Sequence, residues 1–132
     1  MFTKDQIHQA FSKVQTGADF PQLVQDLKSI GMSHYDNYVA DGRTQYFDNK
    51  GNILEGEAKY PTLPLANQTS IEGLKHALLI HQQGQTDYPS FCKDAADAGV
   101  EKWTTHMINM EVTYYDSKGK IMVVEPIPVP AH

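Results

Sequence analysis

The stretch EKWTTHMINMEVTYYDSKGKIMVVE, residues 101–125, decides the fold because it predicts a β-hairpin. Polar and apolar side chains alternate on both sides of the turn DSKG at 116–119, and a period of two residues is typical of a strand with one buried face. The stretch HYDNYVADGRTQYFDNKGNILEGE, residues 34–57, repeats this pattern around the turn DNKG at 48–51. The two stretches align without a gap when the sequence is shifted by 68 residues.

The same shift relates the segments that precede the two hairpins. Identical residues fall at the predicted helix caps and turns, namely Asp19 and Asp87, Pro21 and Pro89, Gly31 and Gly99, Tyr46 and Tyr114. Backbone geometry restricts the choice of residue at such positions. We therefore interpret the chain as a duplicated α-α-β-β unit with repeats at residues 1–57 and 69–125. The alternative is that two similar units need similar caps and turns without any duplication.

Helices are predicted near residues 3–15, 19–30, 70–83 and 87–98. The first begins with a capping box, in which Thr3 caps the helix and Gln6 follows three residues later. Apolar residues recur at the spacing of one buried helical face. Residues 58–68 contain prolines and are predicted to form a linker, and residues 126–132 are predicted to form an extended, proline-rich tail.

The length of the strands depends on Asp41-Gly42. These residues could form a tight turn that divides residues 34–47 into two strands. The second repeat has Asn109-Met110 at the equivalent place, which is no turn signal. We therefore predict one long strand in each repeat, with Gly42 at a β-bulge. The predicted fold is a single α+β domain, residues 1–132, in which a four-stranded antiparallel sheet carries four helices on one face.

Alternation along these long strands predicts which side chains meet the helices. The set predicted to face the helices includes Asp36, Tyr38, Thr44, Tyr46, Thr104, His106, Val112 and Tyr114. The opposite set, which is predicted to be uncovered, includes Tyr35, Arg43, Phe47, Trp103, Met107, Glu111 and Tyr115. Aromatic residues and Met are enriched in interfaces. The uncovered set therefore favours a partner or ligand surface, most simply that of a homodimer packed sheet to sheet, unless the linker or the tail covers it.

The composition limits the classes of function. The chain has 132 residues, of which 11 are basic and 16 acidic, and a net charge of −5. This charge disfavours nucleic-acid binding, which depends largely on Lys and Arg. No apolar run approaches the roughly 20 residues that span a bilayer, and no signal-peptide core follows Met1. We therefore expect a cytoplasmic protein without a nucleic-acid or membrane partner.

The sequence contains no motif for catalysis, for a cofactor or for a metal, so none of these is predicted. Cys92 is the single cysteine. It aligns with the apolar Val24 in the first repeat, which predicts a buried and unreactive thiol.

A few polar residues on the predicted long strands are candidates for binding. His106 is predicted to lie near Tyr38, either as a pH-sensitive group or as a core histidine with its hydrogen bonds satisfied. Arg43 and Glu111 occupy equivalent positions, where they could pair or where Arg43 could bind an anion. Together with the aromatic residues, the candidate binding set is Tyr35, Tyr38, Arg43, Phe47, Trp103, His106, Glu111 and Tyr115.

The whole chain resembles a family of bacterial and prophage-encoded proteins of similar length, which are classed as a domain of unknown function and often labelled "phage envelope protein". The resemblance rests on Phe2-Thr3, Gly31-x-x-x-Tyr35, Asp41-Gly42-x-x-x-Tyr46 and Gly99-Val100-x-x-Trp103. It implies an α+β fold and a prophage-linked origin. It implies no established activity and brings no catalytic residues.

Two hypotheses of function remain open. The first is a non-enzymatic binding or interaction protein that uses the uncovered sheet face or the cleft between the repeats. The second is an enzyme or small-molecule sensor with a pocket at the pseudo-twofold, formed by His106, Tyr38, Arg43 and Glu111. A nucleic-acid regulator is third because of the negative charge.

Overall fold

The helices and strands follow one another in the order ααβββ, and this order occurs twice along the chain. The computed structural model describes residues 2–14 and 19–127. The elements are α1 (Lys4–Ser12), α2 (Phe20–Ser29), β1 (Met32–Tyr38), β2 (Thr44–Asp48), β3 (Ile53–Glu55), α3 (Ile71–Gln82), α4 (Tyr88–Asp97), β4 (Val100–His106), β5 (Glu111–Asp116) and β6 (Ile121–Pro126).

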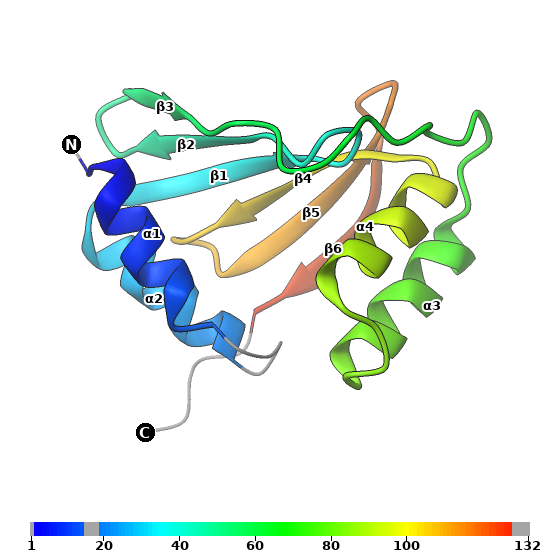
Figure 1. Cartoon of the computed structure of the whole chain (residues 1–132), viewed down its shortest axis with the longest axis horizontal. Coiled ribbons are helices and arrows are strands. Elements are labelled where there is room, and N and C mark those ends of the chain that lie inside the picture. Colours follow the sequence, from blue (N-terminus) through cyan, green and yellow to red (C-terminus); the bar gives the residue numbers. More distant parts are fainter. Residues whose placement is uncertain (1, 15–18, 128–132) are drawn as a thin grey trace.

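All six strands form one antiparallel sheet in the order β3-β2-β1-β4-β5-β6. Both helix pairs lie on the same side of the sheet, with α1 and α2 under one half and α3 and α4 under the other (Figure 1). The predicted α+β class and antiparallel sheet are therefore confirmed. The predicted number of four strands is wrong.

The two additional strands arise because Asp41-Gly42 forms a turn and not a bulge. Gly42 adopts a φ of +76°, which favours glycine, and its N–H donates to the Tyr38 carbonyl at 2.9 Å. Asp41 Oδ1 accepts from the Arg43 N–H at 2.9 Å. The second half has a turn at the same place, where Met110 adopts a φ of 54° without being a glycine. The lack of a turn signal at Asn109-Met110 therefore misled the prediction.

This turn also changes which side chains face the helices. The turn pairs Tyr35 with Tyr46 and Trp103 with Tyr114, and paired residues lie on the same face of a sheet. A continuous strand would have placed the members of each pair on opposite faces, because residue numbers of different parity point to opposite sides. Tyr35 and Trp103 are therefore inner residues, with exposed fractions of 2% and 6%, and their predicted place on the uncovered face is wrong.

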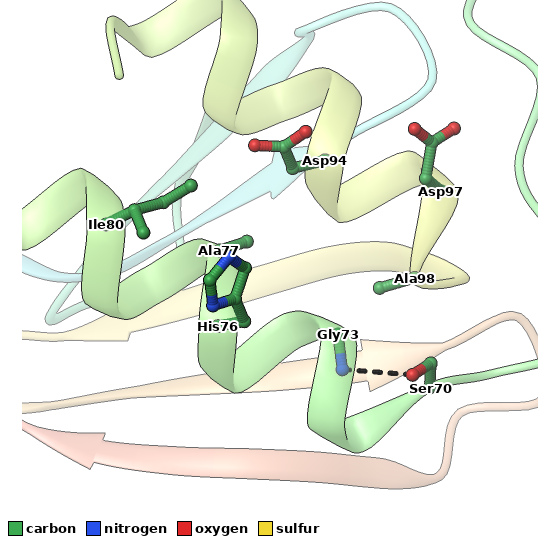
Figure 2. A pocket seen from close by; sticks show the side chains of 8 residues that line it. All are labelled: Ser70, Gly73, His76, Ala77, Ile80, Asp94, Asp97 and Ala98. Atoms are coloured by element: carbon green, nitrogen blue, oxygen red, sulfur yellow. Dashed lines mark hydrogen bonds between the residues drawn. The ribbon is translucent and has the colours of Figure 1, made fainter. Parts of the chain in front are cut away.

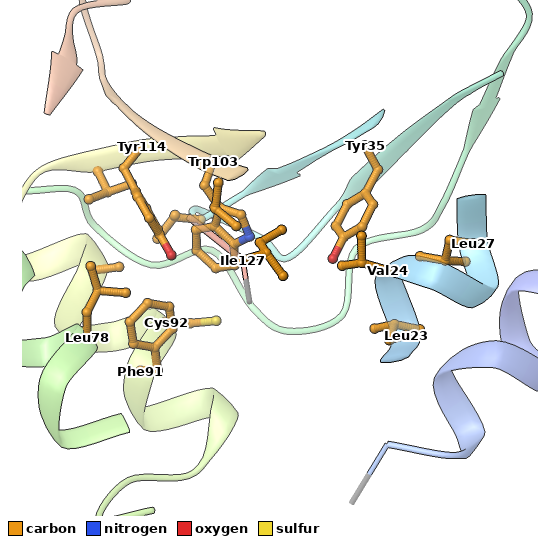
Figure 3. Close-up of a cluster of buried hydrophobic side chains, with 14 of the residues drawn as sticks. Leu23, Val24, Leu27, Tyr35, Leu78, Phe91, Cys92, Trp103, Tyr114 and Ile127 are labelled. Atoms are coloured by element: carbon orange, nitrogen blue, oxygen red, sulfur yellow. The ribbon is translucent and has the colours of Figure 1, made fainter. Parts of the chain in front are cut away.

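The core lies between the inner face of the sheet and the two helix pairs. Figure 3 shows Tyr35, Trp103 and Tyr114 pointing from the sheet toward the helices. On one side they meet α2 residues such as Val24, and on the other they meet α4 residues such as Phe91. Buried side chains from both halves form one cluster, so neither half has a separate core.

Thr3, Ser70 and Asp87 cap their helices as predicted, whereas Asp19 stands at the N-cap position of α2 without a side-chain capping hydrogen bond. Thr3 and Gln6 form the capping box of α1, with Gln6 N–H donating to Thr3 Oγ1 at 3.2 Å. Ser70 Oγ accepts from the Gly73 N–H at the start of α3. The predicted end of the first helix near residues 15–17 and the tail residues 128–132 lie outside the described residues.

The predicted hairpin turns are also confirmed. Asp48 Oδ1 accepts from the backbone N–H groups two and four residues further on, at 2.9 and 2.8 Å. Asp116 Oδ1 does the same in the second hairpin, at 2.9 and 2.9 Å. Asp-x-x-Gly thus closes β2 onto β3 and β5 onto β6 through the same side-chain contacts.

The linker of residues 58–68 packs at one end of the sheet. Lys59 N–H donates to the Asp41 carbonyl at 2.8 Å, and Leu63 N–H donates to the Ala40 carbonyl at 2.6 Å. Beyond these contacts, the Ala66 N–H donates to the carbonyl of Ala96 in α4. The linker is therefore bonded to the 39–42 turn and to α4, on the helix side.

Candidate functional site: the open face of the sheet

The sheet face opposite the helices, called the open face below, presents its central side chains in three rows across the strands. The strand register defines them. The histidine row is Phe47, His34, His106 and Glu111; the central row is Gln45, Asp36, Thr104 and Thr113; the lysine row is Tyr38, Lys102 and Tyr115. Each row thus combines residues from both halves of the chain.

The histidine row is held together by ring contacts. The His34 ring stacks on Phe47 with centroids 4.3 Å apart and an interplanar angle of 9°. The His106 ring centroid lies 6.1 Å from that of His34. Burial lowers the pKa of His34 below its ordinary value; Asp36 opposes this effect, and His106 and Lys102 add to it. The row therefore favours a neutral His34 at pH 7.

The central row carries a buried polar contact between the two halves. Thr104 Oγ1 donates to Asp36 Oδ1 at 2.5 Å, and these two residues are 68 positions apart. Asp36 Oδ2 also lies 3.5 Å from Lys102 Nζ. Asp36 and Thr104 are 7% and 6% exposed, so larger neighbouring side chains enclose this charge.

The lysine row places two cations on aromatic rings. The Arg43 guanidinium lies 4.4 Å from the Tyr38 ring centroid. Lys102 Nζ lies 5.9 Å from the Tyr38 centroid and 5.4 Å from the Tyr115 centroid. Each such contact is worth roughly 0.5–1 kcal/mol at an exposed site. Tyr38 OH also donates to Gln45 Oε1 at 3.1 Å, which joins the lysine row to the central row.

Exposed aliphatic side chains extend the rows onto the edge strands. Ile53 of β3 pairs with Phe47, and Ile121 of β6 pairs with Tyr115. Their exposed fractions are 54% and 55%, and that of Val124 in β6 is 46%. The open face thus has apolar residues at both edges and aromatic rings mixed with charges in the middle.

The structure brings together most of the predicted binding set, but not as predicted. Six of its members lie on the open face, namely Tyr38, Arg43, Phe47, His106, Glu111 and Tyr115. Tyr35 and Trp103 belong to the core. The prediction that His106 and Tyr38 face the helices is wrong. The turns at 39–43 and 107–110 break each predicted long strand, so the alternation of side chains is not continuous from β1 to β2 or from β4 to β5.

Arg43 and Glu111, for which an ion pair was one of two possibilities, are not brought together. Arg43 lies over Tyr38 in the lysine row, whereas Glu111 pairs with His106 at the other end of the face. His34 and Lys102 were missed as site residues. Their position depends on the pairing of β1 with β4, which joins the two halves and leaves no signal in a single sequence.

Two surface hollows lie elsewhere. One of about 380 Å³ lies between α3 and α4, and Figure 2 shows that the carboxylates of Asp94 and Asp97 point away from the His76 ring. The ionisable groups there do not converge on one point. The other, of about 400 Å³, lies between α1 and residues 56–59. Neither hollow is lined by the residues of the predicted pocket.

The predicted cleft between the two repeats contains an apolar side chain. Ile127 follows β6, and its N–H donates to the Met110 carbonyl at 2.7 Å. Its side chain is 6% exposed and lies between Trp103 and Val24 in Figure 3. This position makes Ile127 part of the shared core.

Cys92 lies in the core, as predicted. It is 1% exposed, and burial raises the pKa of its thiol. A thiol that stays protonated is a poor nucleophile. This environment fits a structural side chain.

Within residues 2–14 and 19–127, no helix is long and apolar enough to cross a membrane. In the same part of the chain, no group of three or more His, Cys, Asp or Glu side chains is arranged to hold a metal ion.

The fold and the open face define an α+β protein in which two helix pairs cover one side of a six-stranded antiparallel sheet. The chain belongs to the family described as "Protein of unknown function (DUF1398)", whose model matches residues 8–126. It is also 22% identical over 117 residues to the "Uncharacterized protein YcgX" of Escherichia coli (strain K12), a match that covers 89% of this chain and 87% of the relative. The family match spans every residue of the open face.

Proposed function

We propose that the protein is a non-enzymatic interaction module that binds through its open face. The observation that carries this proposal is the set of partly exposed rings of Tyr38, Phe47 and Tyr115 on a sheet face that has no helix over it. Apolar surface of this kind is rare on monomers and is typical of interaction sites. Aromatic side chains and Arg are also the residues that most often dominate binding energy.

The arrangement of charges supports a surface more than a pocket. His106 and Glu111 lie in the histidine row, and Tyr38 and Arg43 lie at the opposite end of the face. Ligand sites are concave and surround a small molecule with convergent polar groups. The alternative function, an enzyme or sensor with a pocket of these four residues, is therefore less well supported.

The proposal includes the origin and location of the chain. We propose a prophage-linked, cytoplasmic protein that arose by internal duplication of an ααβββ unit. The repeated order of elements, the antiparallel pairing of β1 with β4, and the contact between Asp36 and Thr104 at the 68-residue offset support the duplication. Under this proposal, the contact marks the pseudo-twofold of the two halves.

Site-specific photo-crosslinking tests the function. A photoreactive phenylalanine analogue is placed at Phe47 or Tyr115 on the open face, and at Ile71 or Leu79 as matched controls. The controls are exposed aliphatic residues of α3, with exposed fractions of 46% and 52%. Irradiation of the expressing cells is expected to give discrete products from the open-face positions and none from the controls. Equal labelling from both surfaces, or no product from the open face, contradicts the proposal.

A further inference from the structure

We propose that the occupant of the open face is a second copy of this chain, packed sheet to sheet about a twofold axis that runs across the strands along the central row. The proposal rests on the open face being the interaction surface. It adds the identity of the partner and the geometry of the contact.

The size of the face reaches the lower limit for a specific dimer. The six strands lie about 4.8 Å apart, and rows of side chains on one face lie about 6.7 Å apart, so three rows cover roughly 600 Å². Two such faces bury about 1,200 Å² in total, which reaches the range of specific interfaces. A contact of smaller area would be expected to be transient.

A face that binds its own copy must be self-complementary. Two orientations are compatible with aligned sheet packing. If the twofold axis is parallel to the strands, each row meets the same row of the second copy. If the axis runs across the strands, the histidine row meets the lysine row.

The charges favour the axis across the strands. The lysine row carries Lys102 and the guanidinium of Arg43. An axis parallel to the strands would place the lysine row against the lysine row of the second copy. This axis reverses the strand order, so Lys102 would lie opposite Tyr38, but the cations of both copies would share one pair of facing rows, which is electrostatically unfavourable. The other axis places them on a row that contains Glu111 and the aromatic Phe47. That orientation allows a cation–π contact of Arg43 with Phe47 and places no two Lys or Arg side chains opposite each other.

The central row is compatible with the same axis. Residues of this row would meet their own copies, so the Asp36 of one chain would face that of the other. Each Asp36 is already enclosed and is contacted by Thr104 and Lys102 of its own chain. Gln45 would face Gln45 of the second copy, and two amides can donate to and accept from one another.

Histidine protonation would make such a dimer pH-dependent. His34 faces Phe47, Ser33, Asp36, His106 and Lys102 within its own chain. In the dimer, it would also face Tyr38 and the cations Lys102 and Arg43 of the second copy. Protonation of His34 would place positive charge against these cations, so acid would weaken the dimer.

Thiol cross-linking distinguishes the two orientations. The variant Gln45→Cys carries one partly exposed thiol, because the only other thiol, that of Cys92, is 1% exposed and is expected not to react in the folded protein. Under the proposal, a short bismaleimide joins two Gln45→Cys chains. As a control, Leu79→Cys places an exposed thiol on α3 and is expected to remain uncross-linked.

A mixture of Phe47→Cys chains with Glu111→Cys chains is expected to stay uncross-linked, because these positions meet only if the axis is parallel to the strands. Cross-linking of that mixture, without cross-linking of Gln45→Cys, overturns the proposed axis. Circular dichroism confirms that each variant is folded.

The outcomes separate this inference from the proposed function. A monomer at every concentration, together with photo-crosslinks from Phe47 to other proteins, overturns the second copy and leaves the interaction module in place. A monomer without any open-face photo-crosslink overturns both. Concentration-dependent dimers that cross-link at Gln45→Cys support both.

Discussion

Two adjacent threonines of β4 are expected to respond in opposite ways to the same substitution. Thr105 points into the core and is 0% exposed. Within the described residues, its Oγ1 makes no hydrogen bond of normal geometry, although it lies close enough to the Tyr35 hydroxyl to interact with it. Thr104 points to the open face and donates to Asp36. Val has the shape and β-branching of Thr but lacks the hydroxyl. The pair of variants therefore isolates the contribution of one hydroxyl on each face.

The magnitudes follow from these environments. An unpaired buried hydroxyl costs about 1–3 kcal/mol, so Thr105→Val should stabilise the fold by roughly 1–2 kcal/mol. A hydrogen bond to a charged group contributes about 1.5–3 kcal/mol. Thr104→Val should therefore destabilise the fold by roughly that amount, because the Asp36 carboxylate stays buried after losing a donor.

Urea unfolding at pH 7 measures both changes. All variants are compared at one low protein concentration, because association would add to the apparent stability. The midpoint should rise for Thr105→Val and fall for Thr104→Val with unchanged slopes. A Thr105→Val variant that is less stable than the wild type would refute this prediction and would indicate that Thr105 Oγ1 has a hydrogen-bond partner in the core, for which the Tyr35 hydroxyl is the candidate.

The other predictions concern a turn, the two faces and the response to acid. Gly51 has a φ of +87° and open space around it, so Gly51→Ala should lower the free energy of unfolding by about 1–2 kcal/mol. Gly42→Ala should lower it clearly more in the same urea titration, because the new Cβ would lie 2.7 Å from Tyr60 Cε2. Trp103→Ala should cost about 3–5 kcal/mol, while Tyr115→Ala should change monomer stability by under about 1 kcal/mol; equal losses would contradict the assignment of faces. Because the pKa of His34 is lowered in the folded state, its contribution to the free energy of unfolding is complete above about pH 6.5 and is lost as the pH falls through the folded pKa. His34→Gln should therefore flatten the pH dependence of the urea midpoint between pH 7 and 5.

Local signals in the sequence were sufficient for the elements whose ends depend on nearby side chains. Thr3 with Gln6, and the aspartates of the two hairpin turns, act within four residues of their partners. Such contacts depend on residue type and spacing alone. The α+β class follows from these elements.

The number of strands was missed because a turn can form without a turn signal. Gly42 and Met110 both adopt positive φ at equivalent places, but only glycine is chosen for that conformation by its own sterics. Comparison of the two halves of the chain therefore led us to discard a correct turn signal at Asp41-Gly42. Without this turn, the predicted alternation of side chains was shifted by one residue, so Tyr35 and Trp103 were assigned to the wrong face.

The sequence predicted only some of the residues of the open face, for a different reason. His106 and Phe47 could be identified as unusual residues on strands, but the row that joins them through His34 depends on pairing between β1 and β4. That pairing is a contact between the two halves of the chain. Its register is set by tertiary packing, which no local pattern of residues encodes.

The most direct test of the account is the solution mass of the wild type and of one open-face variant. Sedimentation equilibrium at pH 7.5 should give a concentration-dependent mass that approaches twice the 14.8 kDa of one chain. Tyr115→Asp should give a folded monomer, because it places a carboxylate opposite Glu111 of the second copy. Leu79→Asp, on the exposed surface of α3, should retain the dimer. A wild type that stays at 14.8 kDa at all concentrations, or a Tyr115→Asp variant that still dimerises, would contradict the account.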